Sequence, residues 1–314
     1  MIDLDGKRVV VTGGAGFLGR RVCSMLEDRG AKLSVPRSAE HDLTRQQVVE
    51  RYLAEVAPDV IVHLAAEVGG IGANQANPGR YFYANMAMGM HLIEAARQQG
   101  IAKFVQVGTV CSYPKHTPVP FREYALWDGY PEETNAPYGV AKKSLSVMLE
   151  GYRSQYGMHG VTVIPANLYG PGDNFDLETS HVIPALIRKF MAAASERRTN
   201  VEVWGTGSAS REFLYVEDAA AGIILATERY EDPEPVNLGA GHEVRICDLV
   251  EIVAKLVGFD GDIVWNTSRP DGQPRRMLDV SRARDRFGFE AQVGLHEGLR
   301  RTIAWWRINA DDGR

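Results

Sequence analysis

The first half of the chain alternates between two hydrophobic patterns. Short runs rich in β-branched residues are typical of buried parallel strands, and longer segments with one apolar face are typical of amphipathic helices. The predicted strands are 9–12, 32–35, 59–64, 103–107 and 161–165, and the predicted helices are 20–29, 45–56, 81–99 and 138–156. This alternation predicts a doubly wound parallel sheet, whose ligands bind beyond the carboxyl ends of the strands.

After Gly172 the pattern becomes irregular, with shorter strands such as 201–204 and many turn residues. We predict an N-terminal domain over residues 1–172 and a smaller α/β lobe mainly over residues 173–314. Segments between 213 and 245 are expected to return to the first domain. The sequence shows no repeat, low-complexity tract or flexible linker, so we expect the two parts to form one rigid unit.

Composition narrows the class of protein. The chain has 314 residues, of which 45% are hydrophobic, so it can bury a full core. Its net charge is −5 and it has no basic block, so neither nucleic acid nor an anionic membrane is an expected partner. No apolar run approaches the roughly 18 residues of a membrane helix. Three cysteines do not make a disulfide framework, so we expect a cytoplasmic protein, and we assign it no metal site.

Three glycines follow the first predicted strand in the pattern Gly13-x-x-Gly16-x-x-Gly19. They permit a tight turn, close approach of the backbone to a pyrophosphate, and contact between helix and strand. The N-terminus of the following helix then attracts the phosphate charge. This motif predicts a Rossmann-type domain that binds a dinucleotide, with Phe17 and Leu18 among the contacting residues.

The end of the second strand indicates which dinucleotide binds. An NAD-preferring site usually has an acidic residue about 20 residues after the glycines, which bonds the ribose 2′-hydroxyl. This sequence instead has Arg37 and Ser38, which could bind the 2′-phosphate that a carboxylate would repel. We therefore predict NADP(H), with Asp42 and Leu43 at the adenine end. The remaining predicted cofactor contacts are Ala65, Ala66, Tyr138, Lys142, Pro165, Asn167, Leu168 and His181.

Tyr138 and Lys142 are four residues apart and therefore share one helix face. A lysine ammonium close to a phenol favours the phenolate, so we expect Tyr138 to exchange a proton near neutral pH instead of near its usual pKa of about 10. Thr109 follows the strand that ends at Val107 and would bond the carbonyl oxygen that Tyr138 serves. The three residues indicate hydride transfer between a nicotinamide and a carbonyl carbon, with Tyr138 handling the proton.

With these motifs the chain resembles the extended short-chain dehydrogenase/reductases and, more narrowly, the GDP-L-fucose synthase family. The matching segments run in order over nearly the whole chain, at 63–71 (HLAAEVGGI), 111–115 (CSYPK), 167–175 (NLYGPGDNF), 180–186 (SHVIPAL), 203–207 (VWGTG), 211–214 (REFL) and 270–272 (PDG). The segment around His181 is far more specific than the glycine motif, which marks only the superfamily.

The resemblance implies an NADPH-dependent conversion of GDP-4-keto-6-deoxy-D-mannose to GDP-L-fucose. Cys111 and His181 would exchange protons at the sugar carbons C3 and C5, which flank the C4 ketone. The implied substrate contacts are Asn167, Lys189, Trp204, Arg211, Asp271 and Arg275. A homodimer formed by the helices around 86–99 and 144–156 is implied as well.

Several alternatives stay open at this point. Lys189 could be a solvated lysine, Trp204 a core residue and Asp271 a turn residue, and Arg276 is a further candidate for the pyrophosphate. Thr109 stands where these synthases usually have Ser, and the Gly13-Gly14-Ala15-Gly16 turn has the generic superfamily form, whereas some synthases have an Arg near this alanine that helps bind a 2′-phosphate. The rival functions are a 4-reductase or epimerase for another GDP-linked ketosugar (3,6-dideoxy or heptose), GDP-mannose 3,5-epimerase, and a non-catalytic NADP-binding protein.

Overall fold

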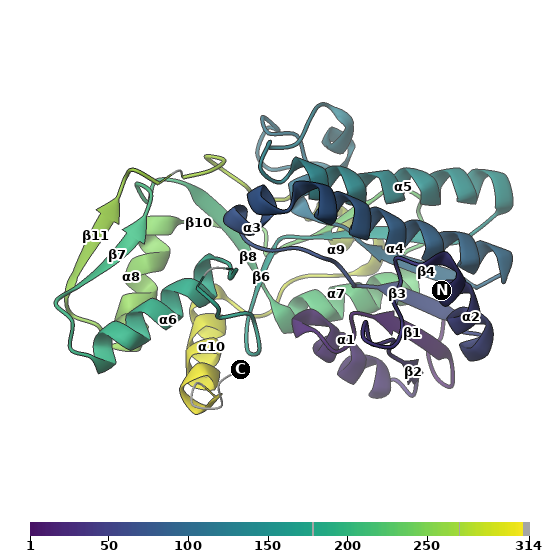
Figure 1. The fold of residues 1–314 in the computed structure, drawn as a ribbon, viewed down its shortest axis with the longest axis horizontal. Helices are drawn as coiled ribbons and strands as arrows, with labels where there is room; N and C mark the ends of the chain where they lie inside the picture. The colour runs from purple at the N-terminus through teal and green to yellow at the C-terminus, as the bar shows by residue number, and fades with distance from the viewer. Residues whose placement is uncertain (178, 270, 310–314) are drawn as a thin grey trace.

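The computed structural model describes residues 1–177, 179–269 and 271–309, which form an elongated molecule with two parts (Figure 1). One part is built on a six-stranded parallel sheet. The other part contains two smaller sheets and three helices. None of the described helices is long and apolar enough to cross a membrane.

The six-stranded sheet has the strand order β2-β1-β3-β4-β5-β9, and every neighbouring pair is parallel. Its strands are β1 (Arg8–Thr12), β2 (Lys32–Ser34), β3 (Val60–His63), β4 (Lys103–Val107), β5 (Gly160–Pro165) and β9 (Val236–Leu238). The chain leaves β1 toward β2 and then returns to β3 on the other side. This reversal opens a crevice beyond the carboxyl ends of β1 and β3, where doubly wound folds bind their ligands.

Helices cover both faces of this sheet (Figure 1). On one face lie α1 (Phe17–Glu27) and α7 (Val216–Arg229), and on the other lie α2 (Gln46–Val56), α4 (Pro78–Gln98) and α5 (Ala136–Tyr156). Consecutive side chains of a strand point to opposite faces. Val9 and Val11 accordingly pack in the core with α1 and α7, whereas Val10 packs in the core with α2, α4 and α5.

The second part has a core of its own. Its elements are a three-stranded sheet of β6 (Asn167–Tyr169), β8 (Ser210–Tyr215) and β10 (Glu243–Arg245), a parallel pair of β7 (Asn200–Trp204) and β11 (Asp262–Asn266), and the helices α6 (Val182–Ser195), α8 (Ile246–Val257) and α10 (Leu295–Asn309). Four short helices complete the fold, namely α3 (Ile71–Ala76), α9 (Ser281–Phe287) and the 3-10 helices η1 (Val110–Ser112) and η2 (Glu123–Trp127).

The predicted strands of the first half are all present, and the larger differences concern where helices begin. α1 begins at Phe17 instead of Arg20, so its first turn lies inside the glycine motif. α4 begins at Pro78 instead of Tyr81, and α5 at Ala136 instead of Tyr138. In α4 and α5 a proline occupies the first turn, where its missing N–H has no helical partner to lose.

The range 213–245 divides between the two parts. β9 pairs with β5 in the large sheet and α7 packs against α1, whereas β8 and β10 belong to the three-stranded sheet. The position of the domain boundary stays a prediction.

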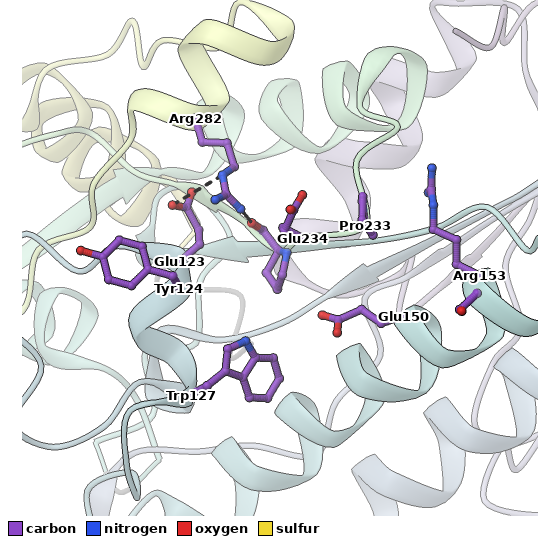
Figure 2. A pocket seen from close by; sticks show the side chains of 10 residues that line it. Glu123, Tyr124, Trp127, Glu150, Arg153, Pro233, Glu234 and Arg282 are labelled. Atoms are coloured by element: carbon purple, nitrogen blue, oxygen red, sulfur yellow. Dashed lines mark hydrogen bonds and ion pairs between the residues drawn. The ribbon is translucent and has the colours of Figure 1, made fainter.

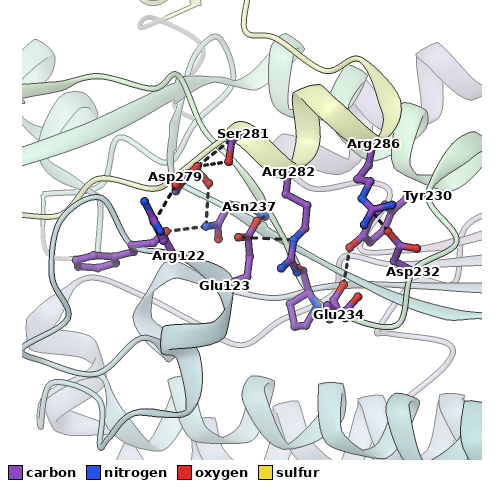
Figure 3. A network of polar contacts seen from close by, with 12 residues as sticks. Arg122, Glu123, Tyr230, Asp232, Glu234, Asn237, Asp279, Ser281, Arg282 and Arg286 are labelled. Atoms are coloured by element: carbon purple, nitrogen blue, oxygen red, sulfur yellow. Dashed lines mark hydrogen bonds and ion pairs between the residues drawn. The ribbon is translucent and has the colours of Figure 1, made fainter.

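A buried asparagine ties the edge strand β9 to distant segments (Figure 3). Asn237 is fully buried, and its side chain donates to the carbonyl oxygens of Phe121 (2.9 Å) and Asp279 (3.1 Å). It accepts from the Tyr113 hydroxyl at 2.7 Å, and its backbone N–H donates to Glu123 at 3.1 Å. These bonds connect the loop after η1 to the segment that precedes α9. They therefore hold both segments beside β9, at the edge of the sheet.

A hollow of about 710 Å³ lies between η2, α5 and residues 233–235, and Figure 2 shows the side chains that line it. Trp127 and Glu150 point into it, and Arg282 borders it by donating to the Pro235 carbonyl oxygen at 2.8 Å. Its described lining contains none of the predicted site residues. The predicted chemistry lies elsewhere, at the crevice of the large sheet.

Candidate active site

The turn between β1 and α1 is shaped to receive a phosphate. Gly13 has a φ of +72°, and a Cβ there would lie 2.8 Å from the backbone nitrogen of Ala65. A Cβ on Gly19 would lie 2.1 Å from the carbonyl oxygen of Gly13, so α1 packs tightly on the loop. Because α1 begins at Phe17, the free amides of its first turn lie directly after the glycines. This cradle fits the pyrophosphate of a dinucleotide.

Two buried side chains support the cradle. The Thr12 hydroxyl accepts from the backbone N–H of Ala65 at 3.2 Å and lies 2.7 Å from Nδ1 of His63. These contacts join the ends of β1 and β3 at the crevice. Burial, followed by the charge of Lys142, lowers the pKa of His63 well below its usual value. His63 is therefore a neutral, structural ring.

The loop after β2 presents the residues predicted to select NADP(H). Arg37 and Ser38 are exposed, and within the described ranges no hydrogen bond or ion pair occupies the Arg37 guanidinium. No acidic residue stands between Ser34 and Ser38. The loop thus offers a free cation and a hydroxyl, which fit a 2′-phosphate.

Asp42 and Leu43 have other partners in the structure. One carboxylate oxygen of Asp42 accepts from the backbone and hydroxyl of Thr44, and the other pairs with Arg45 at 3.2 Å. Leu43 is buried in the core beneath α2 and α4. Asp42 thus pairs with the residue that precedes α2, and contact of Asp42 and Leu43 with the adenine end stays a prediction.

Thr109, Cys111 and Tyr138 form one cluster. The Thr109 hydroxyl caps η1 by accepting from the backbone N–H of Cys111 at 3.2 Å, and it lies near enough to Tyr138 to lower the pKa of that phenol. Tyr138 lies in the first turn of α5 and is buried, while Cys111 is half-buried and close enough to act on Tyr138 electrostatically. Two hydroxyls and a thiol therefore lie close together.

The expected effect of Lys142 on Tyr138 is not found. Burial raises the pKa of Tyr138 above its usual value, the nearby Cys111 adds to the rise, and the bond to Thr109 opposes it. Lys142 is only 2% exposed, and the loss of hydration lowers its pKa to about 7. A lysine with this pKa is only partly charged at neutral pH, so it does not act as a fixed cation that favours the phenolate. The prediction that Tyr138 exchanges a proton near neutral pH is therefore wrong.

Two residues that sequence reasoning missed hold α5 against η1. A Cβ on Gly139 would lie 2.4 Å from the Cys111 carbonyl oxygen, so only glycine permits this approach. Ser112 is buried and donates from its hydroxyl to the Gly139 carbonyl oxygen at 2.9 Å. The available signal was an isolated glycine inside a helical pattern, which usually has a packing reason.

Arg276 lies at the open side of the cluster. Its Nη1 donates to the Cys111 sulfur at 3.7 Å, and its Nε and Nη2 donate to the side-chain oxygen of Gln273 at 3.2 and 3.1 Å. Arg211 is near both groups. Burial and then the charge of Arg276 lower the pKa of Arg211 to about 10. Cys111 thus has two guanidinium groups in its surroundings.

His181 is the residue that precedes α6. The His181 residue is exposed to solvent, yet many protein atoms lie near its ring. The ring therefore loses part of its hydration, which lowers the pKa of His181. A backbone bond of 3.2 Å from Gly70 to Thr179 connects its loop to the segment before α3. Throughout the described chain, no hydrogen bond or ion pair joins the His181 side chain to Cys111 or Tyr138.

An exposed tryptophan lies on the second part of the molecule. Trp204 is 56% exposed, with the Lys189 ammonium 5.5 Å and the Arg269 guanidinium 4.7 Å from its ring centre. Trp204 is therefore not a core residue. An open aromatic face flanked by cations is suited to stacking with a base and to holding phosphate charge.

The other predicted substrate residues already have protein partners. Both carboxylate oxygens of Asp271 accept from Thr206, each at 2.7 Å, and these bonds join two segments that are 65 positions apart in the chain. Arg275 forms an ion pair with Glu243, and the Asn167 amide donates to the carbonyl oxygen of Glu212 at 2.9 Å. Their contacts with a substrate stay predictions.

The crevice, the glycine cradle and the Thr–Tyr–Lys set define a nucleotide-dependent epimerase or dehydratase. The model of the NAD dependent epimerase/dehydratase family matches residues 9–239, and the chain belongs to this family. Within it, the chain is 42% identical over 306 residues to the probable GDP-L-fucose synthase 1 of Oryza sativa subsp. japonica (97% of this chain, 93% of that one). It is 38% identical over 312 residues to the GDP-L-fucose synthase of Sinorhizobium fredii (99% of each chain). The resemblance noted in the sequence is thereby confirmed.

Solved structures agree with this assignment. A GDP-6-OMe-4-keto-L-xylo-heptose reductase from C. jejuni has a TM-score of 0.90 and 28% identity, over 97% of this chain and 98% of that one. A GDP-L-fucose synthetase from Naegleria fowleri bound to NADP has a TM-score of 0.88 and 25% identity, over 98% and 96%. The predicted Rossmann-type α/β fold is confirmed.

Replacing Gly139 tests the close approach of α5 to η1. Gly139→Ala should destabilise the protein by about 2 kcal/mol and lower turnover, because the added carbon displaces the Cys111 backbone. Denaturant unfolding and NADPH oxidation would measure the two effects. Gly79→Ala in α4, whose Cβ would meet nothing within 4 Å, should stay within about 0.5 kcal/mol of the wild type. Equal effects of the two changes would contradict this account.

Lys142→Met should stabilise the protein while removing activity. The pKa of Lys142 is lower in the folded protein than its usual 10.5, so the unfolded state binds more protons between about pH 7 and 10.5. Wild-type stability therefore rises with pH across that window. The variant should exceed the wild type by about 4 kcal/mol near pH 7 and lose this advantage toward pH 10.5.

Unfolding curves at several pH values would measure the difference. Lys255→Met, at an exposed position on α8, is the matched control and should show no such dependence on pH. A stability difference for Lys142→Met that stays constant from pH 6 to 10 would disprove the buried-charge account.

Proposed function

We propose that this protein is an NADPH-dependent epimerase/reductase that converts GDP-4-keto-6-deoxy-D-mannose to GDP-L-fucose. It would invert C3 and C5 and then reduce the C4 ketone. The observation that carries the proposal is the cluster of Thr109, Cys111 and Tyr138, which places two hydroxyls beside a thiol. The names of the relatives in rice and Sinorhizobium fredii support the choice of substrate.

The residues of the crevice would hold NADP(H). Gly13, Gly16 and Gly19 would receive the pyrophosphate, and Arg37 and Ser38 the 2′-phosphate. The NADP bound to the similar Naegleria fowleri structure supports this choice. When bound, the reduced cofactor supplies the hydride for C4 of the sugar.

Inversion at C3 and C5 requires a base and an acid. The C4 ketone acidifies the neighbouring C–H bonds, and the Cys111 thiolate would take a proton from such a carbon. An S–H bond then forms, the C–H bond breaks, and its electron pair moves to O4 as an enolate. His181 would return a proton to the opposite face of the carbon. The Thr109 and Tyr138 hydroxyls would stabilise the negative charge on O4.

Reduction needs a proton donor at O4 when the C4–H bond forms. Tyr138 is suited to this role, because its raised pKa keeps the phenol protonated at neutral pH. It would donate its proton to O4 and become a phenolate. Lys142, with its pKa of about 7, is able to accept and release protons near neutral pH and could help to reprotonate Tyr138.

The second part of the molecule would bind the GDP portion. The guanine base would stack on Trp204, whose ring is exposed and flanked by Lys189. Arg211 would bind the pyrophosphate, because it is a cation close to Cys111 and therefore to the reacting sugar. Asn167, Asp271 and Arg275 remain candidates for the hydroxyls and phosphates of the substrate.

A homodimer and a cytoplasmic location complete the proposal. Large apolar side chains are exposed on α4 (Tyr83, 64%; Met90, 41%) and on α5 (Val147, 52%). Pairing of α4 and α5 with their copies in a second chain would bury them. The three free cysteines agree with a reducing compartment.

A second GDP-linked ketosugar is the competing substrate. The structural similarity to a heptose reductase from C. jejuni supports this alternative, since the two chains share nearly their whole length. The half-buried thiol of Cys111 beside Tyr138 favours an enzyme that inverts as well as reduces.

Tyr138→Phe tests the proton donor. Turnover of GDP-4-keto-6-deoxy-D-mannose, followed by NADPH absorbance, should fall at least about a hundredfold because O4 loses its acid. NADPH binding, followed by fluorescence titration, should stay unchanged. Tyr130→Phe at an exposed position is the control and should leave both measurements as in the wild type. Unchanged turnover in Tyr138→Phe would remove this residue from the mechanism.

Cys111→Ser tests the base. In D₂O the variant should incorporate deuterium at C3 and C5 about a hundredfold more slowly than the wild type, because a serine hydroxyl ionises far less readily than a thiol. NADPH affinity should be the same in both proteins. Cys247→Ser, on α8, should exchange at the wild-type rate. Full-rate exchange in Cys111→Ser would assign the base to another group.

A further inference from the structure

The surroundings of Cys111 contain one contact that the proposed function does not use. An Arg276 guanidinium nitrogen lies 3.7 Å from the Cys111 sulfur and donates to it. The other titratable or charged groups near this sulfur, among the described residues, are Arg211 and Tyr138. A thiol is a weak base until it ionises, and a neighbouring cation stabilises the thiolate.

Gln273 binds the guanidinium nitrogens of Arg276 that do not contact Cys111. The Nε and Nη2 of Arg276 share the side-chain oxygen of Gln273, at 3.2 and 3.1 Å. Gln273 is buried, and its amide donates to the carbonyl oxygen of Lys115 at 2.7 Å. Lys115 follows η1 in the chain, so the same loop that carries Cys111 also anchors the residue that directs Arg276.

The backbone on both sides of Arg276 is fixed as well. Glu212 donates its N–H to the Arg276 carbonyl oxygen at 3.0 Å, and its carboxylate accepts from the N–H of Leu278 at 2.7 Å. Glu212 is 1% exposed and also accepts from Gly241 at 2.7 Å. A buried carboxylate with these partners leaves the segment around Arg276 little freedom to move.

We propose that Arg276 is the positioning residue that keeps Cys111 in its thiolate form, and that Gln273 directs the guanidinium to the sulfur. The inference rests on the proposed function, because inversion at C3 and C5 is the step that needs a thiolate. It gives Arg276 a different role from pyrophosphate binding. Arg211 is then left as the cation for that group.

Alkylation by iodoacetamide reports the thiolate of Cys111 without any turnover. The rate would be followed on the full-length protein over a range of pH by mass spectrometry of the Cys111 peptide. Arg276→Gln should slow alkylation about tenfold at neutral pH and match the wild type at alkaline pH, where both thiols are ionised. Equal rates at neutral pH would overturn the proposal. An equal loss at every pH would also overturn it, since that result indicates changed access.

Matched variants separate charge from structure. Arg275→Gln removes the neighbouring cation, which pairs with Glu243 instead, and should leave alkylation of Cys111 unchanged. Arg276→Lys keeps the charge and should restore part of the rate. Gln273→Glu keeps Arg276 but places a competing carboxylate beside it, and should also slow alkylation at neutral pH. A wild-type rate in Gln273→Glu would contradict the proposal even if Arg276→Gln failed to fold.

The proposed function is tested separately from this contact. With GDP-4-keto-6-deoxy-D-mannose in D₂O, Arg276→Gln should lose deuterium exchange in proportion to its loss of alkylation, with little change in KM. A raised KM together with unchanged alkylation would make Arg276 a pyrophosphate ligand and overturn the inference. If the wild type does not act on this sugar nucleotide, the proposed function fails, while the alkylation profile still decides the role of Arg276.

Discussion

The site depends on the close approach of α5 to η1. Gly139 lies against the Cys111 carbonyl oxygen, and the Ser112 hydroxyl bonds the Gly139 carbonyl oxygen. Tyr138 precedes this glycine and Thr109 caps the start of η1, so the same packing sets the separation of the two residues. A residue with a Cβ at position 139 would separate α5 from η1 and so Tyr138 from Thr109. The geometry of the candidate site is therefore set by backbone packing, and the positions of the polar side chains follow from it.

Burial of Tyr138 and Lys142 shifts the pKa values of both side chains. It raises the pKa of Tyr138 and lowers the pKa of Lys142, so the phenol remains protonated and the lysine is only partly charged near neutrality. Both shifts have one physical cause, because an ionised group loses hydration in the protein interior. A buried lysine also destabilises the fold, and proteins commonly retain functional residues that lower their stability. The cation that donates to the Cys111 sulfur is instead an arginine, Arg276.

Much of the fold could be predicted from the sequence, because buried strands appear as runs of β-branched residues and helices as a periodic pattern of apolar residues. The glycine motif and the Tyr138–Lys142 pair were visible for the same reason, since their spacing reflects local geometry. The contact between Arg276 and Cys111 could not be found in this way, because 165 residues separate them in the chain. The pKa of Tyr138 was missed because spacing along a helix says nothing about burial. Asp271 shows a further limit: the sequence offered a substrate ligand or a turn residue, and the carboxylate instead binds Thr206, which is 65 positions away in the chain.

The central claim is that one site inverts two carbons and reduces a third. The most direct test gives the wild-type protein GDP-4-keto-6-deoxy-D-mannose and NADPH in D₂O and examines the product by NMR. The account predicts oxidation of NADPH and a GDP-L-fucose product that carries deuterium at C3 and C5. Reduction without deuterium at these carbons would contradict it, because Cys111 and His181 would then have no part in proton exchange.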